Sequence, residues 1–307
     1  MLSDPDVLAE LAGEARPDPV VALAQGAPRL GDVPANVDRH LELIAQAAER
    51  GADLVVFPEL SLTGYFLKDL VADSAVRLEG KEISALARAS RAVDCVVGCI
   101  LEGDDHRLHN AAVYLSRGEV VHVHRKVYLP TYGLFDEARY LAAGDRFRAF
   151  TMPLPSARAH REWRAGILIC EDLWHPTSPA VLARDGVDVV ICPSASPGRG
   201  VGSGAELGTA QSYDVMTRTY AQLLTTYVVY CNRVGYEDGV GFWGGSRVVG
   251  PDGEIRGEPA GREEAMPLHR LERGALRRAR IANPMLRDER HDVVDAEMRR
   301  LRRRSRM

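Results

Sequence analysis

The sequence predicts an α/β protein in which helices cover a mixed β-sheet. Short apolar runs typical of buried strands alternate with segments of helical periodicity. Turn residues between some neighbouring strands indicate hairpins, so the sheet should contain antiparallel as well as parallel pairs. Runs such as 187–192 are apolar at every position but Asp188, and both faces of their sheet should therefore be covered.

The first half of the chain predicts strands joined by helices and one hairpin. Asn36 is expected to cap a helix that ends near Gly51, with apolar positions recurring at helical spacing between them. A second helix is expected at 83–93. The strands expected in this half lie at 20–24, 54–57, 95–101, 113–115 and 120–123, the last two forming the hairpin.

The second half continues the alternation after a loop at 132–150. An apolar run leads to Cys170, and a hairpin turn is expected at 250–253. The other expected elements are a short helix at 179–184, a strand at 187–192, a long helix at 209–226 and a strand at 227–232. We divide the chain into an N-terminal arm (1–18), one domain (19–265) and an Arg-rich C-terminal extension (266–307).

Composition indicates a globular enzyme that binds neither nucleic acid nor membrane. The 307 residues carry a net charge of −4, and no apolar stretch has the length of a membrane span. The segment from Arg270 to Met307 contains 13 arginines and six acidic residues. Nucleic-acid binding would favour aromatic residues among the arginines, and there are none. A solvated helix or a subunit contact is the preferred interpretation of this basic segment. Since the first residues lack the features of a signal peptide, a cytoplasmic location is expected.

The five cysteines predict reduced thiols and no metal site. Their number is odd, and no pair has the Cys-x-x-Cys spacing of zinc ligands. Cys95 and Cys99 are not accompanied by a second cluster of Cys or His. No cofactor is expected.

Three expected strand ends carry a thiol, a carboxylate and an ammonium: Cys170, Glu59 and Lys126. Open α/β sheets gather reactive groups at such ends. Glu59 can accept the thiol proton, while Lys126 and the backbone N–H of Glu171 can stabilise an oxyanion. The set therefore indicates attack of Cys170 on a carbonyl carbon, followed by hydrolysis of a thioester.

Each of these residues has a structural alternative when taken alone. Cys170 by itself would more often be a buried core thiol, and Glu59 a carboxylate at the start of a helix. Lys126 by itself would be a surface charge, although the chain has only three lysines among 39 basic residues. The three together favour catalysis. Arg199 can bind a substrate carboxylate, but a surface loop is the preferred interpretation.

Three strings around these residues resemble the nitrilase, or carbon–nitrogen hydrolase, superfamily. They are FPELSLTGY at 57–65, RKVYLP at 125–130 and ICEDLW at 169–174. The resemblance covers about residues 19–255 and implies a four-layer α-β-β-α sandwich with mixed sheets. It also implies that Glu59, Lys126 and Cys170 are catalytic, with Glu137 as a supporting glutamate.

Within the superfamily, the chain is most similar to the glutaminase domain of glutamine-dependent NAD synthetases. The likeness rests on LTGY at 62–65 and on LPTYGLFDEARY at 129–140. It implies that Tyr65, Tyr132, Glu171 and Trp174 line the pocket, and that Glu171 binds a substrate ammonium. Solvation of a strand end or a helix cap is an equal alternative for Glu171. The sequence has no Ser-Gly-Gly nucleotide loop, and its Gly-rich stretch at 198–204 is not a dinucleotide fingerprint.

The function expected is a thiol-dependent amidase that hydrolyses a small linear, glutamine-like amide and releases ammonia. Two alternatives use the same residues: an N-carbamoyl amide hydrolase and a nitrilase. A third belongs to another class, a glutaminase subunit that supplies ammonia to a synthetase. The family resemblance also implies a homodimer or a higher homo-oligomer.

Overall fold

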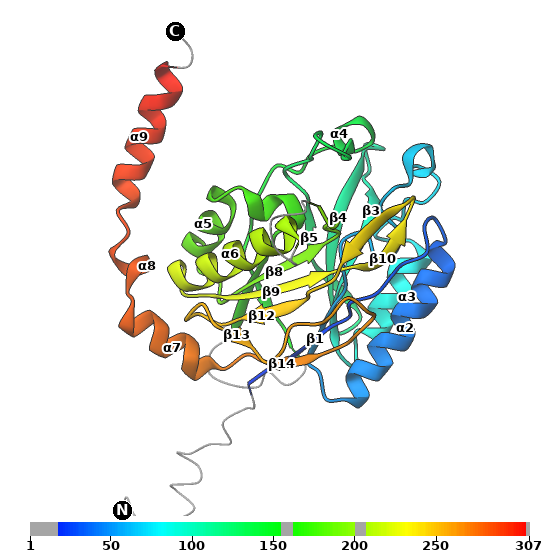
Figure 1. Cartoon of the computed structure of the whole chain (residues 1–307), viewed down its shortest axis with the longest axis horizontal. Helices are drawn as coiled ribbons and strands as arrows, with labels where there is room; N and C mark the ends of the chain where they lie inside the picture. The colour runs from blue at the N-terminus through cyan, green and yellow to red at the C-terminus, as the bar shows by residue number, and fades with distance from the viewer. Residues whose placement is uncertain (1–17, 155–161, 200–206, 305–307) are drawn as a thin grey trace, which may run out of the picture.

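Two six-stranded sheets form the centre of the protein (Figure 1). The computed structural model describes residues 18–154, 162–199 and 207–304. The first sheet has the order β14 (Leu268–Arg270), β1 (Val20–Leu23), β2 (Leu54–Val56), β3 (Asp94–Glu102), β4 (Leu108–Ser116) and β5 (Glu119–Arg125). The second has the order β13 (Ile255–Arg256), β12 (Arg247–Val249), β9 (Tyr227–Asn232), β8 (Val189–Ser194), β7 (Trp163–Ile167) and β6 (Phe150–Met152).

Both sheets are mixed, as the sequence predicts. In the first sheet β1, β2 and β3 are parallel, whereas β14, β4 and β5 pair antiparallel with their neighbours. In the second, β7, β8 and β9 are parallel and flanked by antiparallel β6 and β12. The expected hairpins are confirmed between β4 and β5 and between β12 and β13. A separate ribbon pairs β10 (Val234–Glu237) with β11 (Val240–Trp243).

Helices cover the outer face of each sheet (Figure 1). On the first sheet lie α2 (Val33–Glu49) and α3 (Lys81–Ala89), and on the second lie α5 (Thr177–Arg184) and α6 (Gly208–Leu223). One core cluster joins the facing sides of the two sheets, where Val56 and Val96 belong to the same cluster as Ile167 and Val190. The predicted four-layer α-β-β-α sandwich is therefore confirmed.

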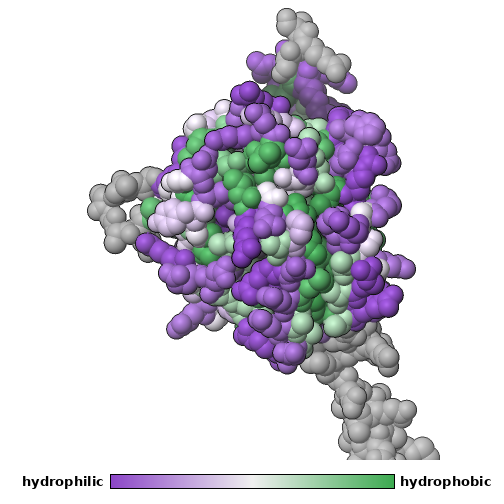
Figure 2. Space-filling model, turned by 90° about the vertical axis from the view of Figure 1, so that its right-hand side faces the viewer, coloured by the Kyte–Doolittle hydropathy of each residue, from purple (hydrophilic) through white to green (hydrophobic). Residues whose placement is uncertain are grey.

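The outer surface over α2 and α3 is largely hydrophilic, with a narrower run of hydrophobic side chains (Figure 2). Helix α2 buries Val37, Ile44 and Ala47 against the first sheet. Between these positions it presents charged side chains such as Asp38 and Arg39 to solvent. This division follows the helical period of the sequence.

The helix cap predicted at Asn36 is wrong. Helix α2 begins one turn earlier, and the side chain of Asp32 caps it by accepting a hydrogen bond from the backbone N–H of Ala35. Pro34 fits the first turn because proline needs no N–H partner there. Asn36 is instead buried, and its amide donates to the carbonyl oxygens of Arg29 and Leu62. It thus ties α2 to the loop that follows Glu59.

The segment expected as a C-terminal extension begins within the first sheet. Strand β14 pairs with β1, and α7 (Arg273–Ala282) buries Leu276 against the core. The short helix α8 (Met285–Asp288) and the longer α9 (His291–Arg304) follow. The N-terminal arm predicted at 1–18 lies outside the described residues except for Asp18. In the described part of the chain, no helix combines the length and the apolarity needed to cross a membrane.

Candidate active site

The three predicted catalytic residues follow strands of both sheets. Glu59 comes after β2, Lys126 directly after β5, and Cys170 after β7, at the start of the 3₁₀ turn η2 (Cys170–Trp174). Because the two sheets face each other, their strand ends bring these residues to one edge of the sandwich. Glu59 and Lys126 are each 1% exposed, and Cys170 is also buried.

The carboxylate of Glu59 is held by three donors. One oxygen, Oε1, accepts from Lys126 Nζ at 2.8 Å and from the amide of Asn110 at 2.7 Å. The other, Oε2, accepts from the backbone N–H of Ala195 at 2.7 Å. Asn110 lies on β4 and Ala195 follows β8, so both sheets fix the orientation of this carboxylate.

Lys126 joins two buried carboxylates. Its Nζ lies 2.6 Å from Glu137 Oε1 as well as 2.8 Å from Glu59. Burial alone would lower the pKa of Lys126, but the two carboxylates raise it well above its ordinary value. Burial raises the pKa of Glu137, while Lys126 acts in the opposite direction. An ammonium has three N–H groups, and one remains available here among the described residues.

Cys170 begins a tight turn. Its φ of 45° lies in the left-handed region, which is costly for a residue with a Cβ. Burial raises the pKa of its thiol well above the usual value, and the charge of Glu59 adds to this effect. Lys126 and a hydrogen bond with Tyr213 lower that pKa. The Cys170 sulfur lies 3.1 Å from the hydroxyl of Tyr213.

The carboxylate of Asp172 connects the cysteine turn to the lysine strand. It accepts from the backbone N–H of Ile169 and from His124 Nε2 with Oδ2, at 3.0 and 2.8 Å. With Oδ1 it accepts from the N–H groups of Val127 and Tyr128, each at 3.0 Å. The side chain is fully buried. One residue therefore sets the position of Cys170 relative to Lys126.

A cavity of about 480 Å³ opens onto Cys170. Three of the four predicted pocket residues, Tyr132, Glu171 and Trp174, line it together with Arg199. The Tyr132 hydroxyl donates to Glu171 at 2.9 Å. Burial raises the pKa of Glu171, and burial together with Glu171 raises the pKa of Tyr132 to about 12. Both groups thus experience a partly desolvated environment.

The fourth predicted pocket residue, Tyr65, lies behind this cavity. Its hydroxyl donates to Glu137, and it lines a separate cavity of about 310 Å³ with that residue. Its backbone N–H donates to Glu237 of β10 at 2.7 Å. Tyr65 therefore contacts the carboxylate network rather than the cavity that holds Cys170.

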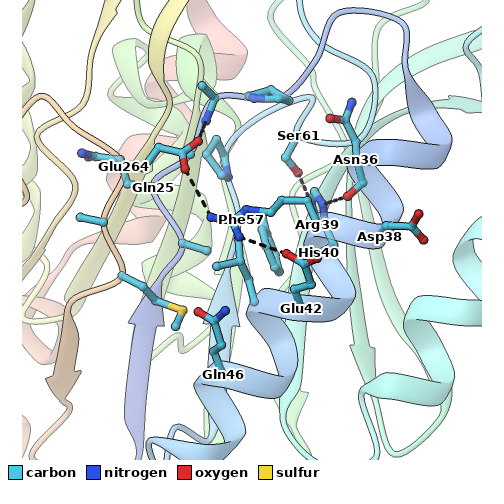
Figure 3. Close-up of a pocket in the computed structure, with 18 of the residues that line it drawn as sticks. Gln25, Asn36, Asp38, Arg39, His40, Glu42, Gln46, Phe57, Ser61 and Glu264 are labelled. Carbon is cyan, nitrogen blue, oxygen red and sulfur yellow. Dashed lines mark hydrogen bonds and ion pairs between the residues drawn. The ribbon is translucent and has the colours of Figure 1, made fainter.

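A second cavity lies away from these residues (Figure 3). It measures about 650 Å³ and opens between α2 and the segment around Glu264. Arg39 reaches both Glu42 and Glu264 across it. On one wall, His40 stacks on Phe57 and lies 2.9 Å from the Ser61 hydroxyl. Phe57, Pro58 and Ser61 of the loop that carries Glu59 line this cavity, but Glu59 itself does not, and no cysteine is among its lining residues.

Four residues of the site have no counterpart among the sequence predictions: Asn110, Asp172, Ala195 and Tyr213. Asn110 lies within an apolar strand, where a polar residue indicates a specific partner. Asp172 follows Cys170 by two residues, and its local sequence is equally compatible with a solvated carboxylate at a strand end or a helix cap. Tyr213 and Ala195 carry no local pattern, because their positions depend on how the second sheet packs.

Comparison with known proteins agrees with this fold. Residues 20–281 match the carbon–nitrogen hydrolase family. The solved carbon-nitrogen hydrolase from Helicobacter pylori has a TM-score of 0.78 at 23% identity, covering 91% of this chain and 98% of that one. An amidase from Nesterenkonia sp. has a TM-score of 0.73 at 23% identity, covering 92% and 97%. Both share the nitrilase-like sandwich.

The curated relatives include longer proteins. The glutamine-dependent NAD(+) synthetase of Thermotoga maritima is 34% identical over 242 residues, 76% of this chain and 39% of that protein. The synthetase of Synechocystis sp. is 30% identical over 288 residues, 87% and 49% respectively. The solved synthetase of Acinetobacter baumannii has a TM-score of 0.73 at 29% identity, covering 84% of this chain and 46% of that one. The chain thus spans less than half the length of these relatives.

The fold and the three strand-end motifs define a hydrolase of the nitrilase superfamily. This chain belongs to the carbon–nitrogen hydrolase family. The resemblance inferred from the three motifs is confirmed.

Proposed function

We propose that this chain hydrolyses the C–N bond of a small linear, glutamine-like amide through a thioester on Cys170, and releases ammonia. The observation that carries the proposal is the buried cluster of Glu59, Lys126 and Glu137 beside a thiol at the base of a cavity. A carboxylate, an ammonium and a thiol suffice for acyl transfer without a cofactor.

In the first half-reaction, Glu59 takes the thiol proton as sulfur bonds to the amide carbon, and the carbonyl electron pair moves to oxygen. The third N–H of Lys126, which does not bond to Glu59 or Glu137, and the backbone N–H of Glu171 stabilise this oxyanion. When the oxyanion collapses, the C–N bond breaks and Glu59 returns its proton to nitrogen. Ammonia leaves, and the acyl group stays on Cys170.

In the second half-reaction, Glu59 takes a proton from water, whose oxygen attacks the thioester carbon. The C–S bond then breaks, and Glu59 reprotonates the sulfur. One amide and one water thus give one carboxylic acid and one ammonia. Glu137 and Tyr65 keep Lys126 in position throughout.

A negatively charged group in the cavity favours a substrate with an ammonium. Glu171 lines the cavity and is oriented by Tyr132, so the α-amino group of a glutamine-like amide can pair with it. Arg199 lines the same cavity and can bind an α-carboxylate. Opposite charges at these two positions suit an amino acid amide better than a nitrile.

A panel of amides tests the proposal through ammonia and carboxylate measured together. We expect equal amounts of both products from wild type and none from Cys170→Ala. Ammonia with CO2 would instead indicate a carbamoyl substrate, and consumption of a nitrile would indicate a nitrilase. Undiminished hydrolysis by Cys170→Ala would refute a thioester mechanism.

The relatives named glutamine-dependent NAD synthetases favour a second candidate, in which the ammonia is passed to a synthetase. Glutamine hydrolysis should then rise when an ammonia-dependent NAD synthetase is added. Full activity of the isolated chain, unchanged by that addition, would count against this candidate.

A further inference from the structure

Helix α6 places a tyrosine hydroxyl against the candidate nucleophile. Tyr213 is buried, and its oxygen lies 3.1 Å from the sulfur of Cys170. Its ring packs against Tyr230 and Trp243 of the second sheet and its ribbon, with ring centroids 4.7 and 6.3 Å away. The hydroxyl is therefore held at the sulfur by the packing of its ring on these two aromatic side chains, which also contact each other.

A second contact determines which atom donates. The indole Nε1 of Trp174 lies 3.1 Å from the same Tyr213 oxygen. An indole N–H can only donate, so the Tyr213 oxygen is the acceptor in this pair. A thiolate has no proton and can only accept. When Cys170 is ionised, the O–H of Tyr213 must therefore point to the sulfur.

We propose that Tyr213 is a further catalytic residue, whose hydroxyl donates a hydrogen bond to the Cys170 thiolate and is oriented for this by Trp174. The inference rests on the proposed role of Cys170 as nucleophile. Hydrogen bonds to ionised groups are about twice as strong as neutral ones, so Tyr213 stabilises the negative charge that develops on sulfur as Glu59 takes the thiol proton. The same bond re-forms when the thioester C–S bond breaks and sulfur leaves with its electron pair.

The surroundings of Cys170 make this donor important. Burial and the charge of Glu59 both oppose ionisation of the thiol, whereas Lys126 and Tyr213 favour it. Burial keeps the pKa of Tyr213 well above its ordinary value, so the phenol retains the proton that it donates. The titratable groups whose charges interact with Cys170 are Glu59, Tyr65, Lys126, Tyr132, Cys192, Tyr213 and Tyr230.

The test compares Tyr213→Phe with wild type by alkylation of Cys170 with iodoacetamide at a series of pH values. Phenylalanine keeps the ring packing and removes only the hydroxyl. Loss of one donor to the thiolate should raise the thiol pKa, so the inflection should move up by roughly one pH unit, with about tenfold slower alkylation below it. The kcat/KM for the amide should fall by about the same factor.

Tyr220→Phe is the matched control, because it makes the same change on the same helix where the ring packs only partly against the core. It should leave the alkylation profile unchanged. Trp174→Phe should move the inflection in the same direction by a smaller amount, since the hydroxyl loses the donor that orients it. That variant also tests the proposal independently, should Tyr213→Phe fail to fold.

A folded Tyr213→Phe protein whose alkylation profile coincides with wild type would overturn the proposal, as would an unshifted Trp174→Phe profile. Alkylation needs no substrate, so this outcome is separate from the choice of amide. If the profile shifts while no amide is hydrolysed by wild type, the proposed function fails and the role of Tyr213 at the thiol stands.

Discussion

The ammonium of Lys126 lies 2.8 Å from the carboxylate of Glu59, and both side chains are almost completely buried. A second carboxylate, that of Glu137, lies 2.6 Å from the same nitrogen. Buried charges are tolerated only when they are paired and hydrogen-bonded, because their desolvation is costly. These three residues are therefore candidates for catalysis, and the protein is also expected to need all three charges for stability at this edge of the sandwich.

Removing the cation should destabilise the protein as well as inactivate it. In Lys126→Met, Glu59 and Glu137 would face each other without a counter-charge. We expect the free energy of unfolding to fall by about 3–5 kcal/mol, as it does when one partner of a buried pair is removed. Urea denaturation measures this loss. As a control, Lys68→Met removes a lysine from an exposed pair with Asp238 and should leave the urea midpoint unchanged. Equal urea midpoints for Lys126→Met and Lys68→Met would contradict this interpretation of the buried cluster.

Asp172→Asn should separate the cysteine turn from the lysine strand. Asparagine keeps one acceptor oxygen, but its amide nitrogen would face two of the four donors that Asp172 now satisfies. We expect a loss of about 2–4 kcal/mol in the free energy of unfolding and a large drop in kcat. Asp104→Asn changes an exposed carboxylate and should have neither effect. Wild-type kcat in a folded Asp172→Asn protein would refute the positioning role.

The sequence predicts the parts of this protein that depend on local pattern. Strand β9 lies at the predicted residues, because its apolar run is continuous and bounded by clear breaks. The motifs around Glu59, Lys126 and Cys170 also place these residues at strand ends. Only the start of α2 differs from the prediction, because Asp32 and Asn36 are both residue types that cap helices, and the hydrogen bond from Asn36 to the Leu62 carbonyl decides between them.

Contacts across the sandwich could not be predicted in the same way. Tyr213 lies 43 residues after Cys170 in the sequence. It reaches the Cys170 sulfur only because α6 packs on the second sheet. Tyr65 was expected in the substrate pocket, yet its hydroxyl points to Glu137. Both outcomes depend on the relative placement of elements, for which spacing in the sequence carries no information.

Glu237 should act on the site from the β10–β11 ribbon. Its carboxylate accepts from the backbone N–H groups of Tyr65 and Phe66 and pairs with buried Arg233 at 2.5 Å. In Glu237→Gln the charge of Arg233 would be left unpaired and the Tyr65 loop would loosen. We expect kcat to fall roughly tenfold, because Tyr65 no longer fixes Glu137. The neighbouring Asp238→Asn, on an exposed side chain, is the control, and an equal effect of both variants would contradict a specific role for Glu237.

The stability of the protein should depend on pH through His40, which lines the cavity beside α2 (Figure 3). Burial lowers the pKa of His40 to about 4 from the ordinary 6.5. The imidazole is stacked on Phe57 and bonded to the Asn36 carbonyl and the Ser61 hydroxyl, so the folded protein keeps it neutral. The unfolded chain takes up a proton as pH falls below about 6.5, whereas the folded protein does so only near pH 4.

Between pH 6.5 and 4 the free energy of unfolding should therefore fall by about 3 kcal/mol on account of this residue, with no contribution above that window. Urea denaturation at half-unit pH steps measures the slope. His40→Gln should be less stable than wild type at pH 7, since it loses the stacking on Phe57, yet show a shallower decline toward pH 4. His291→Gln, at the start of α9, should keep the wild-type slope. If the free energies of unfolding of His40→Gln and wild type fell in parallel between pH 6.5 and 4, the neutral buried imidazole of His40 would not explain the acid sensitivity.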